Sequence, residues 1–343
     1  AFAVAYGTLQ IFDTLGARRI AANDYIHLYD ESTIYLQLDR FLQAHNRLMD
    51  SISSELVEPT QERFVTWGSN DTTNMIEGDE FSRPEVQKVS VTPTMIGFPL
   101  RIKQVAYGVT SLFMQTKTMG DLEQVVTAAI DADVRDRLIT IRQVLFNPLD
   151  NLTYTDRWVD KATLPLRALT NADGTYIPPD MFGNTFNANT HTHYLGTASP
   201  VDSDLTALIR TVVEHYTTGA VKVFINPAQE ALVRGFTTGT TKFYPYYDAR
   251  ITPSISQDAA RGTPLDQLNI YNRAIGIYGA AEIWIKPWIP AGYIFAFNTN
   301  VPKPLRMRTR NAVRGNLRIA ADLELYPLRA QFMEREYGIS CLE

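Results

Sequence analysis

The sequence predicts an α+β fold, and three observations support that prediction. Residues 121–147 carry apolar side chains at the three- and four-residue spacing of a long helix. Residues 60–112 contain two strand-like stretches on either side of a polar, acidic middle. After Pro200, short helical and strand-like segments alternate, and strands dominate the C-terminal tail. A chain of 343 residues has room for two domains.

The N-terminal segment, residues 1–59, is predicted to be an extended arm followed by one helix. Its first half shows no clean periodicity. From residue 34 to residue 56, apolar side chains recur every three or four positions, which is typical of one helical face. Asp30 or Ser32 can cap the start of this helix, and Pro59 ends it because the residue before a proline disfavours the helical conformation.

Residues 60–112 are predicted to form an extended loop built on a β-hairpin. The stretches 63–67 and 96–109 have strand character, whereas the region between them is acidic and contains Glu77, Asp79 and Glu80. An isolated two-stranded ribbon is only marginally stable in water. This excursion therefore needs a surface on which to lie.

The clearest predicted element is the long helix over 121–147, within a region that spans 113–150. Thr118 or Asp121 can cap its start, and Pro148 stops it. At a rise of 1.5 Å per residue, roughly 26 residues span about 39 Å. Charged residues occupy its other faces, as expected for a helix that packs with one side.

Residues 151–300 change from loop to α/β character, and residues 301–343 form a strand-rich tail. The tail alternates strongly and predicts two or three antiparallel strands. The loop over 237–264 is too long for an ordinary connection. Between these, we expect helices over 205–216 and 228–236 and strands over 221–225, 274–278, 282–285 and 293–297.

Composition and charge exclude several classes of protein. A formal net charge of −5 argues against a chain that binds nucleic acid through overall basic charge. The single cysteine, Cys341, excludes an internal disulfide framework and a cysteine-rich zinc module. No stretch supplies the roughly 20 apolar residues that a membrane helix needs. The charged fraction of 20% is below the usual value of about 25%, which favours a surface partly covered by other proteins.

The sequence predicts no catalytic residues, no cofactor and no enzyme activity. It has no G-x-S-x-G elbow, no H-E-x-x-H and no correctly spaced phosphate loop. His191 and His193 are the best metal candidates, because residues two apart on a strand share a face. A solvated pair in an Asn- and Thr-rich loop is the preferred interpretation, since acidic residues are distant in sequence, and so no metal site is predicted. A metal-dependent hydrolase that uses this pair is a remote alternative function.

The tail also contains a basic run with no acidic residue inside it. Alternation predicts that the guanidinium groups of Arg306, Arg308 and Arg310 project from one strand face. Three interpretations are open: a solvated strand face, non-specific phosphate contact, and pairing with acidic groups of another subunit. The run consists of Lys303, Arg306, Arg308, Arg310, Arg314 and Arg318.

The order of these elements resembles the major capsid proteins of tailed double-stranded DNA phages, which have the Hong Kong 97 fold. Three stretches carry the resemblance locally. Residues 283–297 resemble the family's strand, proline-glycine turn and second strand, and residues 328–339 resemble its closing strand. Residues 221–236 resemble the strand, Asn-Pro and short helix of its central domain.

The resemblance implies a Hong Kong 97-like division of the chain. It comprises an N-terminal arm and helix (1–59), an extended loop (60–112), a peripheral domain with a spine helix (113–150), an axial domain (151–300) and a return to the peripheral domain (301–343). No scaffolding segment is visible before the arm, so we expect either a mature form or a separate scaffold protein.

The implied function is that of a major capsid protein, which self-assembles into an icosahedral shell enclosing double-stranded DNA. The implied partners are the chain itself in pentamers and hexamers, DNA by non-specific contact, and portal, scaffold and decoration proteins, with no membrane. The implied location is the virion capsid, assembled in the cytoplasm of a bacterial host. An encapsulin-like nanocompartment, which shares the fold but holds protein cargo, is the alternative.

The charge pattern adds a hypothesis about contacts between subunits. We expect the acidic residues of the extended loop (Glu77, Asp79 and Glu80) to meet the three alternating arginines of an adjacent tail. Charge-assisted bonds between arginine and carboxylate would fix the register of the contact more than they add affinity.

Overall fold

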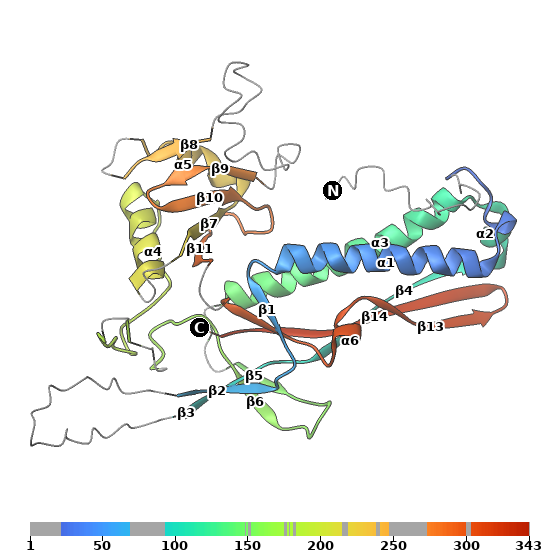
Figure 1. Ribbon diagram of the computed structural model, residues 1–343, viewed down its shortest axis with the longest axis horizontal. Coiled ribbons are helices and arrows are strands. Elements are labelled where there is room, and N and C mark those ends of the chain that lie inside the picture. Colours follow the sequence, from blue (N-terminus) through green and yellow to red (C-terminus); the bar gives the residue numbers. More distant parts are fainter. Residues whose placement is uncertain are drawn as a thin grey trace, which may run out of the picture.

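The computed structural model describes residues 22–68, 93–147, 149, 152–174, 177, 179–180, 183–214, 219–237, 241–246, 273–299 and 303–342. Within these ranges the fold is a mixture of helix and sheet, as the sequence predicts (Figure 1). Most of the predicted arm, the acidic part of the extended loop and most of the predicted loop over 237–264 lie outside the described residues.

Two long helices, α1 (Glu31–Ser53) and α3 (Met119–Leu145), lie side by side along a sheet (Figure 1). Leu42 of α1 and Ile130 of α3 are buried in one cluster with Met333 from the sheet. Both helices confirm the prediction made from the spacing of apolar residues in the sequence. None of the helices in the described ranges is long and apolar enough to cross a membrane.

The start of α3 is fixed by a capping box. The Thr118 backbone N–H donates to Asp121 Oδ2 at 3.0 Å, and the Thr118 hydroxyl accepts from the Asp121 backbone N–H at 3.4 Å. These bonds satisfy donors that the first turn leaves unpaired. The bond to the Thr118 backbone holds the pKa of Asp121 below its usual value. The helix thus begins at Met119, two residues before the predicted start, with both predicted capping residues in use.

The first sheet is organised around the long C-terminal strand β14 (Leu328–Cys341). β14 pairs antiparallel with β4 (Arg101–Thr110), β13 (Arg318–Leu325) and β12 (Leu305–Arg308) along its length. Strand β1 (Val57–Thr60) adds to the outer side of β12 in parallel orientation. The three tail strands confirm the predicted antiparallel arrangement.

The extended loop is anchored by a separate hairpin of β2 (Phe64–Gly68) and β3 (Pro93–Gly97). The second stretch predicted to belong to this excursion, 96–109, divides at residues 98–100. Beyond that break, β4 runs back along β14 instead of continuing the hairpin. The alternating burial of β4 fits a strand with one face on the helices, which is why its sequence resembles hairpin strands.

A second small hairpin, β5 (Leu152–Thr155) and β6 (Thr163–Leu166), supports the base of the first. Strands β3 and β6 approach so closely that a Cβ on Gly97 would lie 2.6 Å from the Cβ of Leu164. A larger residue at position 97 would push the two hairpins apart. The predicted loop-rich region therefore contains an ordered support for the extended loop.

The second sheet has the order β11-β7-β10-β9-β8, with β7 and β10 parallel and the other pairs antiparallel. Its core is apolar, with Val223, Ile225 and Ile283 fully buried. The strands are β7 (Val221–Ile225), β8 (Phe243–Pro245), β9 (Arg273–Tyr278), β10 (Ala281–Ile285) and β11 (Ile294–Asn298).

Short helices complete the second sheet. α4 (Asp202–Glu214) packs near β11 and β7. The predicted helix over 228–236 is a 3-10 turn, η2 (Pro227–Gln229), followed by α5 (Glu230–Arg234). The remaining short elements are η1 (Ile26–Leu28), α2 (Ser111–Thr116) and α6 (Ala312–Gly315).

Candidate functional site

The basic run of the tail is paired with carboxylates of the same chain. Five of its six residues form ion pairs with acidic residues. These acidic residues lie outside the basic run in the sequence and come close to it only in the folded chain. The positive charge of this region is thus largely compensated within the subunit. The pairs are Arg306–Glu58, Arg308–Asp156, Arg310–Glu336, Arg314–Glu336 and Arg318–Glu334.

Arg308 is buried, so the interpretation of a solvated strand face does not hold for its guanidinium group. Its Nη1 donates to Asp156 Oδ2 at 2.9 Å and to the carbonyl oxygen of Phe98 at 3.0 Å. Asp156, whose side chain is fully buried, also lies 3.1 Å from Nε of Arg63. The two contacts of Arg308 come from the residue that follows β3 and from the turn between β5 and β6. Arg308 therefore joins β12 to both hairpins and is not accessible to a neighbouring subunit.

Arg306 and Arg310 keep more exposure. Arg306 lies directly opposite Glu58 in the β1–β12 register, with Nη2 3.1 Å from Oε2. Arg310 lies beyond the end of β12, where its Nε is 2.8 Å from Oε2 of the buried Glu336. Its guanidinium carbon lies 5.6 Å from the centre of the Trp158 ring. Both arginines remain within reach of a partner.

The acidic half of the predicted contact falls outside the described residues. Glu77, Asp79 and Glu80 belong to residues 69–92, whose placement is not described. Contact between these residues and Arg306 or Arg310 of another subunit stays a prediction.

A buried charge cluster ties α1 and α3 to β14. Asp133 Oδ2 lies 2.9 Å from Nε2 of His45 and 2.6 Å from Nη1 of Arg335. Arg335 is fully buried and also donates to the carbonyl oxygen of Gly315 at 2.8 Å. Burial alone would raise the pKa of Asp133, but the hydrogen bond with His45 and the charge of Arg335 hold it below its usual value. This cluster fixes the two long helices on the sheet.

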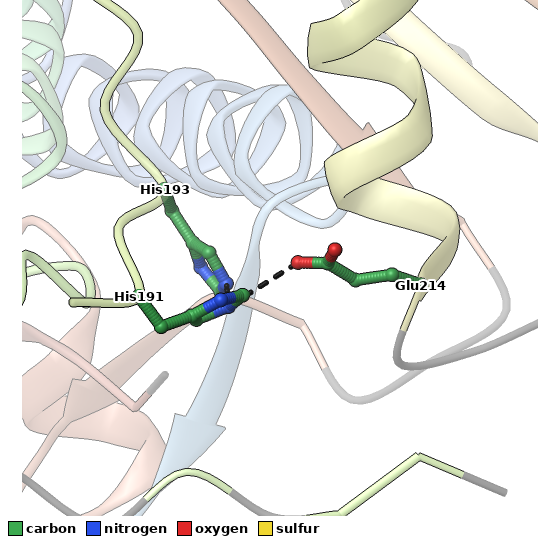
Figure 2. A group of neighbouring side chains, drawn as sticks. All are labelled: His191, His193 and Glu214. Atoms are coloured by element: carbon green, nitrogen blue, oxygen red, sulfur yellow. Dashed lines mark hydrogen bonds and ion pairs between the residues drawn. The ribbon is translucent and has the colours of Figure 1, made fainter. Parts of the chain in front are cut away.

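The candidate histidines meet a third residue, Glu214, at the end of α4 (Figure 2). The Nε2 atoms of His191 and His193 are 3.0 Å apart, and Nε2 of His191 lies 3.2 Å from Oε1 of Glu214. One ligand atom from each residue lies within 4.8 Å of the others. Burial raises the pKa of Glu214, and the charge of His191 partly offsets this. The structure thus brings together a two-nitrogen, one-oxygen set of the kind that binds metal ions.

The backbone around the two histidines is held by neighbouring segments. His193 N–H donates to the carbonyl oxygen of Thr170 at 2.9 Å, and the His191 carbonyl accepts from Ala172 N–H at 2.8 Å. The Phe186 ring packs on the His191 ring, with centroids 4.7 Å apart. The segment makes a single β-bridge through Thr192 and is not the strand that the spacing suggested. Both rings nevertheless point to one side.

Glu214 is the residue that the sequence did not connect to this pair. The contact with His191 depends on where α4 ends relative to the loop before it, and no periodicity encodes that distance. The three side chains are therefore visible as a cluster only in the folded chain.

Comparison with known proteins identifies the architecture. No family model and no curated protein matches the chain. A solved structure from Mycobacterium phage Patience has a TM-score of 0.65 and 21% identity, and the alignment covers 96% of this chain and 92% of that one. A capsid of a native GTA particle (TM-score 0.42, 9% identity, 85% and 86% covered) and a virus-like particle from Pyrococcus furiosus (0.39, 13%, 88% and 91%) match less well.

The Patience alignment carries the assignment, because it spans nearly all of both chains at a TM-score above 0.5. The two weaker matches add no argument. Identity is low throughout, so the comparison concerns the fold and not the individual side chains. The chain has the fold of the tailed-phage major capsid proteins, the Hong Kong 97-type fold.

Proposed function

We propose that this protein is a major capsid protein that self-assembles into an icosahedral shell enclosing the double-stranded DNA of a tailed bacteriophage. The observation that carries the proposal is the agreement of the fold with the Mycobacterium phage Patience structure over 96% of the chain. A function that resides in interfaces needs no catalytic residue, and the proposal therefore includes no enzyme activity.

The β2–β3 hairpin supports the proposal physically. It forms a two-stranded sheet of its own, and Phe64 and Met95 expose 43% and 45% of their surface. Its other face is packed within the subunit, where Ile96 is buried in one cluster with Leu342, so only the face of Phe64 and Met95 lacks a covering surface among the described residues. In a shell, the neighbouring subunit supplies that surface.

The far end of the β13–β14 hairpin supports it in the same way. Leu325, Tyr326 and Leu328 lie together at its turn and are 68%, 87% and 45% exposed. Clustered apolar side chains on a projecting element mark a protein interface more often than a solvated surface. Two apolar projections on one subunit suit head-to-tail contacts, which close into rings.

The proposed partners follow from this arrangement. They are other copies of the chain in pentamers and hexamers, packaged DNA held by enclosure and non-specific contact, and portal, scaffold and decoration proteins. The proposed location is the virion, after assembly in the bacterial cytoplasm. The proposed domains keep the bounds 1–59, 60–112, 113–150, 151–300 and 301–343, except that β4, within 60–112, belongs to the first sheet because it pairs with β14.

The proposed contact between the acidic loop and the basic tail of a neighbouring subunit now involves two arginines instead of three. Because Arg308 is buried by its own chain, we propose Arg306 and Arg310 as the arginines that meet the acidic loop of a neighbour. Both already have a carboxylate partner, so the neighbour's acids would extend existing ion pairs into a network.

Removal of the extended loop tests the proposal. A variant in which a short Gly-Ser turn replaces residues 69–92 retains β2, β3 and the body of the subunit. We expect a native circular dichroism spectrum but only slowly sedimenting subunits, whereas the unaltered protein sediments as large particles. Shells from the shortened variant at normal yield would contradict the role of the loop.

A further inference from the structure

We propose that His191, His193 and Glu214 form a binding site for a divalent transition-metal ion, for which Zn²⁺ is the best match. The site lies within one subunit and joins the loop before α4 to the C-terminal end of that helix. It does not depend on the proposed shell function, because no residue of a neighbouring copy is needed.

The spacing of the ligand atoms fits one shared ion. Zn²⁺ bonds imidazole nitrogen and carboxylate oxygen at about 2.0–2.2 Å, which places tetrahedral ligand atoms roughly 3.3–3.6 Å apart. The separations are 3.0 Å between the two Nε2 atoms and 3.2 Å between His191 Nε2 and Glu214 Oε1. A slight outward rotation of the side chains brings these separations to the tetrahedral value. Figure 2 shows the three polar ends converging on one point.

The ligand types select the class of metal. Two imidazole nitrogens with one carboxylate oxygen suit Zn²⁺ and related transition metals, whereas Mg²⁺ and Ca²⁺ prefer shells made entirely of oxygen. Three protein ligands leave a fourth position for water. The half-buried setting limits competition from solvent, since the side chains of His191 and Glu214 are 14% and 29% exposed.

The charge around Glu214 favours a cation at this place. Glu214 is the last described residue of α4, and the last described turn of this helix contains no basic residue. A bound divalent cation would compensate the Glu214 carboxylate.

The scaffold is organised before any ion binds. Backbone hydrogen bonds at 2.8–2.9 Å fix His191 and His193 against residues 170–172, and α4 is tied to the second sheet through the Tyr278 hydroxyl, which donates to the Asp202 carbonyl at 2.8 Å. Binding therefore requires only side-chain adjustment. The ion would act as a cross-link that stiffens this part of every subunit.

Metal titration of the full chain tests the proposal. Protein stripped with EDTA and returned to metal-free buffer is titrated with ZnCl₂ in a calorimeter, and bound zinc is measured after gel filtration. We expect one Zn²⁺ per chain and a higher unfolding temperature with Zn²⁺, because a ligand that binds only the folded state stabilises it. Zinc bound far below one equivalent would overturn the proposal.

Variants locate the site. The double substitution His191→Gln/His193→Gln should weaken binding by more than about 100-fold, since even outer-shell changes cost roughly 10–100-fold. Glu214→Gln, which keeps the shape of the side chain, should weaken binding with a native circular dichroism spectrum. His27→Gln is the control, because His27 is exposed and bonds the carbonyl of Gln115 instead. Unchanged binding in the first two variants would overturn the site.

Discussion

Removal of the Arg308 guanidinium group should destabilise the subunit far more than removal of Arg306, although the two residues lie on the same short strand. Arg308→Met leaves the fully buried Asp156 with Arg63 as its remaining cation and takes a donor from the Phe98 carbonyl. Loss of one member of a buried ion pair costs about 3–5 kcal/mol. Arg306→Met breaks a pair whose side chains are 22% and 40% exposed, which costs about 0–1 kcal/mol.

The free energy of unfolding, measured by urea denaturation of unassembled subunits, gives the comparison directly. Circular dichroism and tryptophan fluorescence should report the same midpoint, and a constant denaturant slope shows that the denatured state has not changed. In thermal scans, roughly 2–4 °C per kcal/mol predicts a fall in Tm of about 6–20 °C for Arg308→Met and at most about 4 °C for Arg306→Met. Methionine is used at both positions because it keeps the length of the apolar stem.

A double variant sharpens the experiment. Replacing both charges, as in Arg308→Met/Asp156→Leu, removes the unpaired buried carboxylate and should recover part of the loss. Equal destabilisation by Arg308→Met and Arg306→Met would refute the reasoning, because burial of the pair would then make no energetic difference.

Three further predictions follow from particular contacts. Asp133→Asn should destabilise the subunit by about 3–5 kcal/mol at pH 7. Because the folded state lowers the pKa of Asp133, the stabilisation by its carboxylate is present above the unfolded pKa of about 3.9 and is lost as pH falls below that value. Denaturation at pH 3 should therefore show a smaller difference in stability between the variant and the unaltered protein. Thr118→Ala should cost about 1 kcal/mol through loss of the α3 cap, while Thr116→Ala, which removes an exposed hydroxyl, changes little in the same thermal scans. Neutralisation of the acidic loop by Glu77→Gln, Asp79→Asn and Glu80→Gln should lower the yield of shells in sedimentation and leave the monomer folded, whereas Asp39→Asn with Glu62→Gln should leave the yield unchanged; equal yields would remove these acids from the interface.

Periodicity predicted the elements with local signals. The helices α1 and α3 and the strands β7, β10 and β14 follow from apolar spacing, and Thr118 and Asp121 were identified as capping residues because cap chemistry is local. The prediction that β4 continues the hairpin was wrong. Apolar and polar residues alternate in the same way in a free hairpin and in a sheet with one covered face. Pairing partners of strands are set by the whole chain.

For the site residues too, local features could be predicted from the sequence, whereas contacts between distant segments could not. Alternation puts Arg308 on the same strand face as Arg306, but the Phe98 carbonyl and Asp156, which lies between β5 and β6, bind its guanidinium group within the same chain. Likewise, His191 and His193 were recognised as a pair, while Glu214 joins them only through the end of α4. Long-range neutralisation of charge, which decides what a basic run can bind, depends on contacts that one sequence does not display.

Negative-stain electron microscopy of the concentrated, purified protein tests the central claim most directly. The fold and its two apolar projections predict closed polyhedral particles of uniform size, built from pentamers and hexamers of this chain. A field of compact, isolated subunits at the same concentration would contradict the assignment of this protein as a shell subunit.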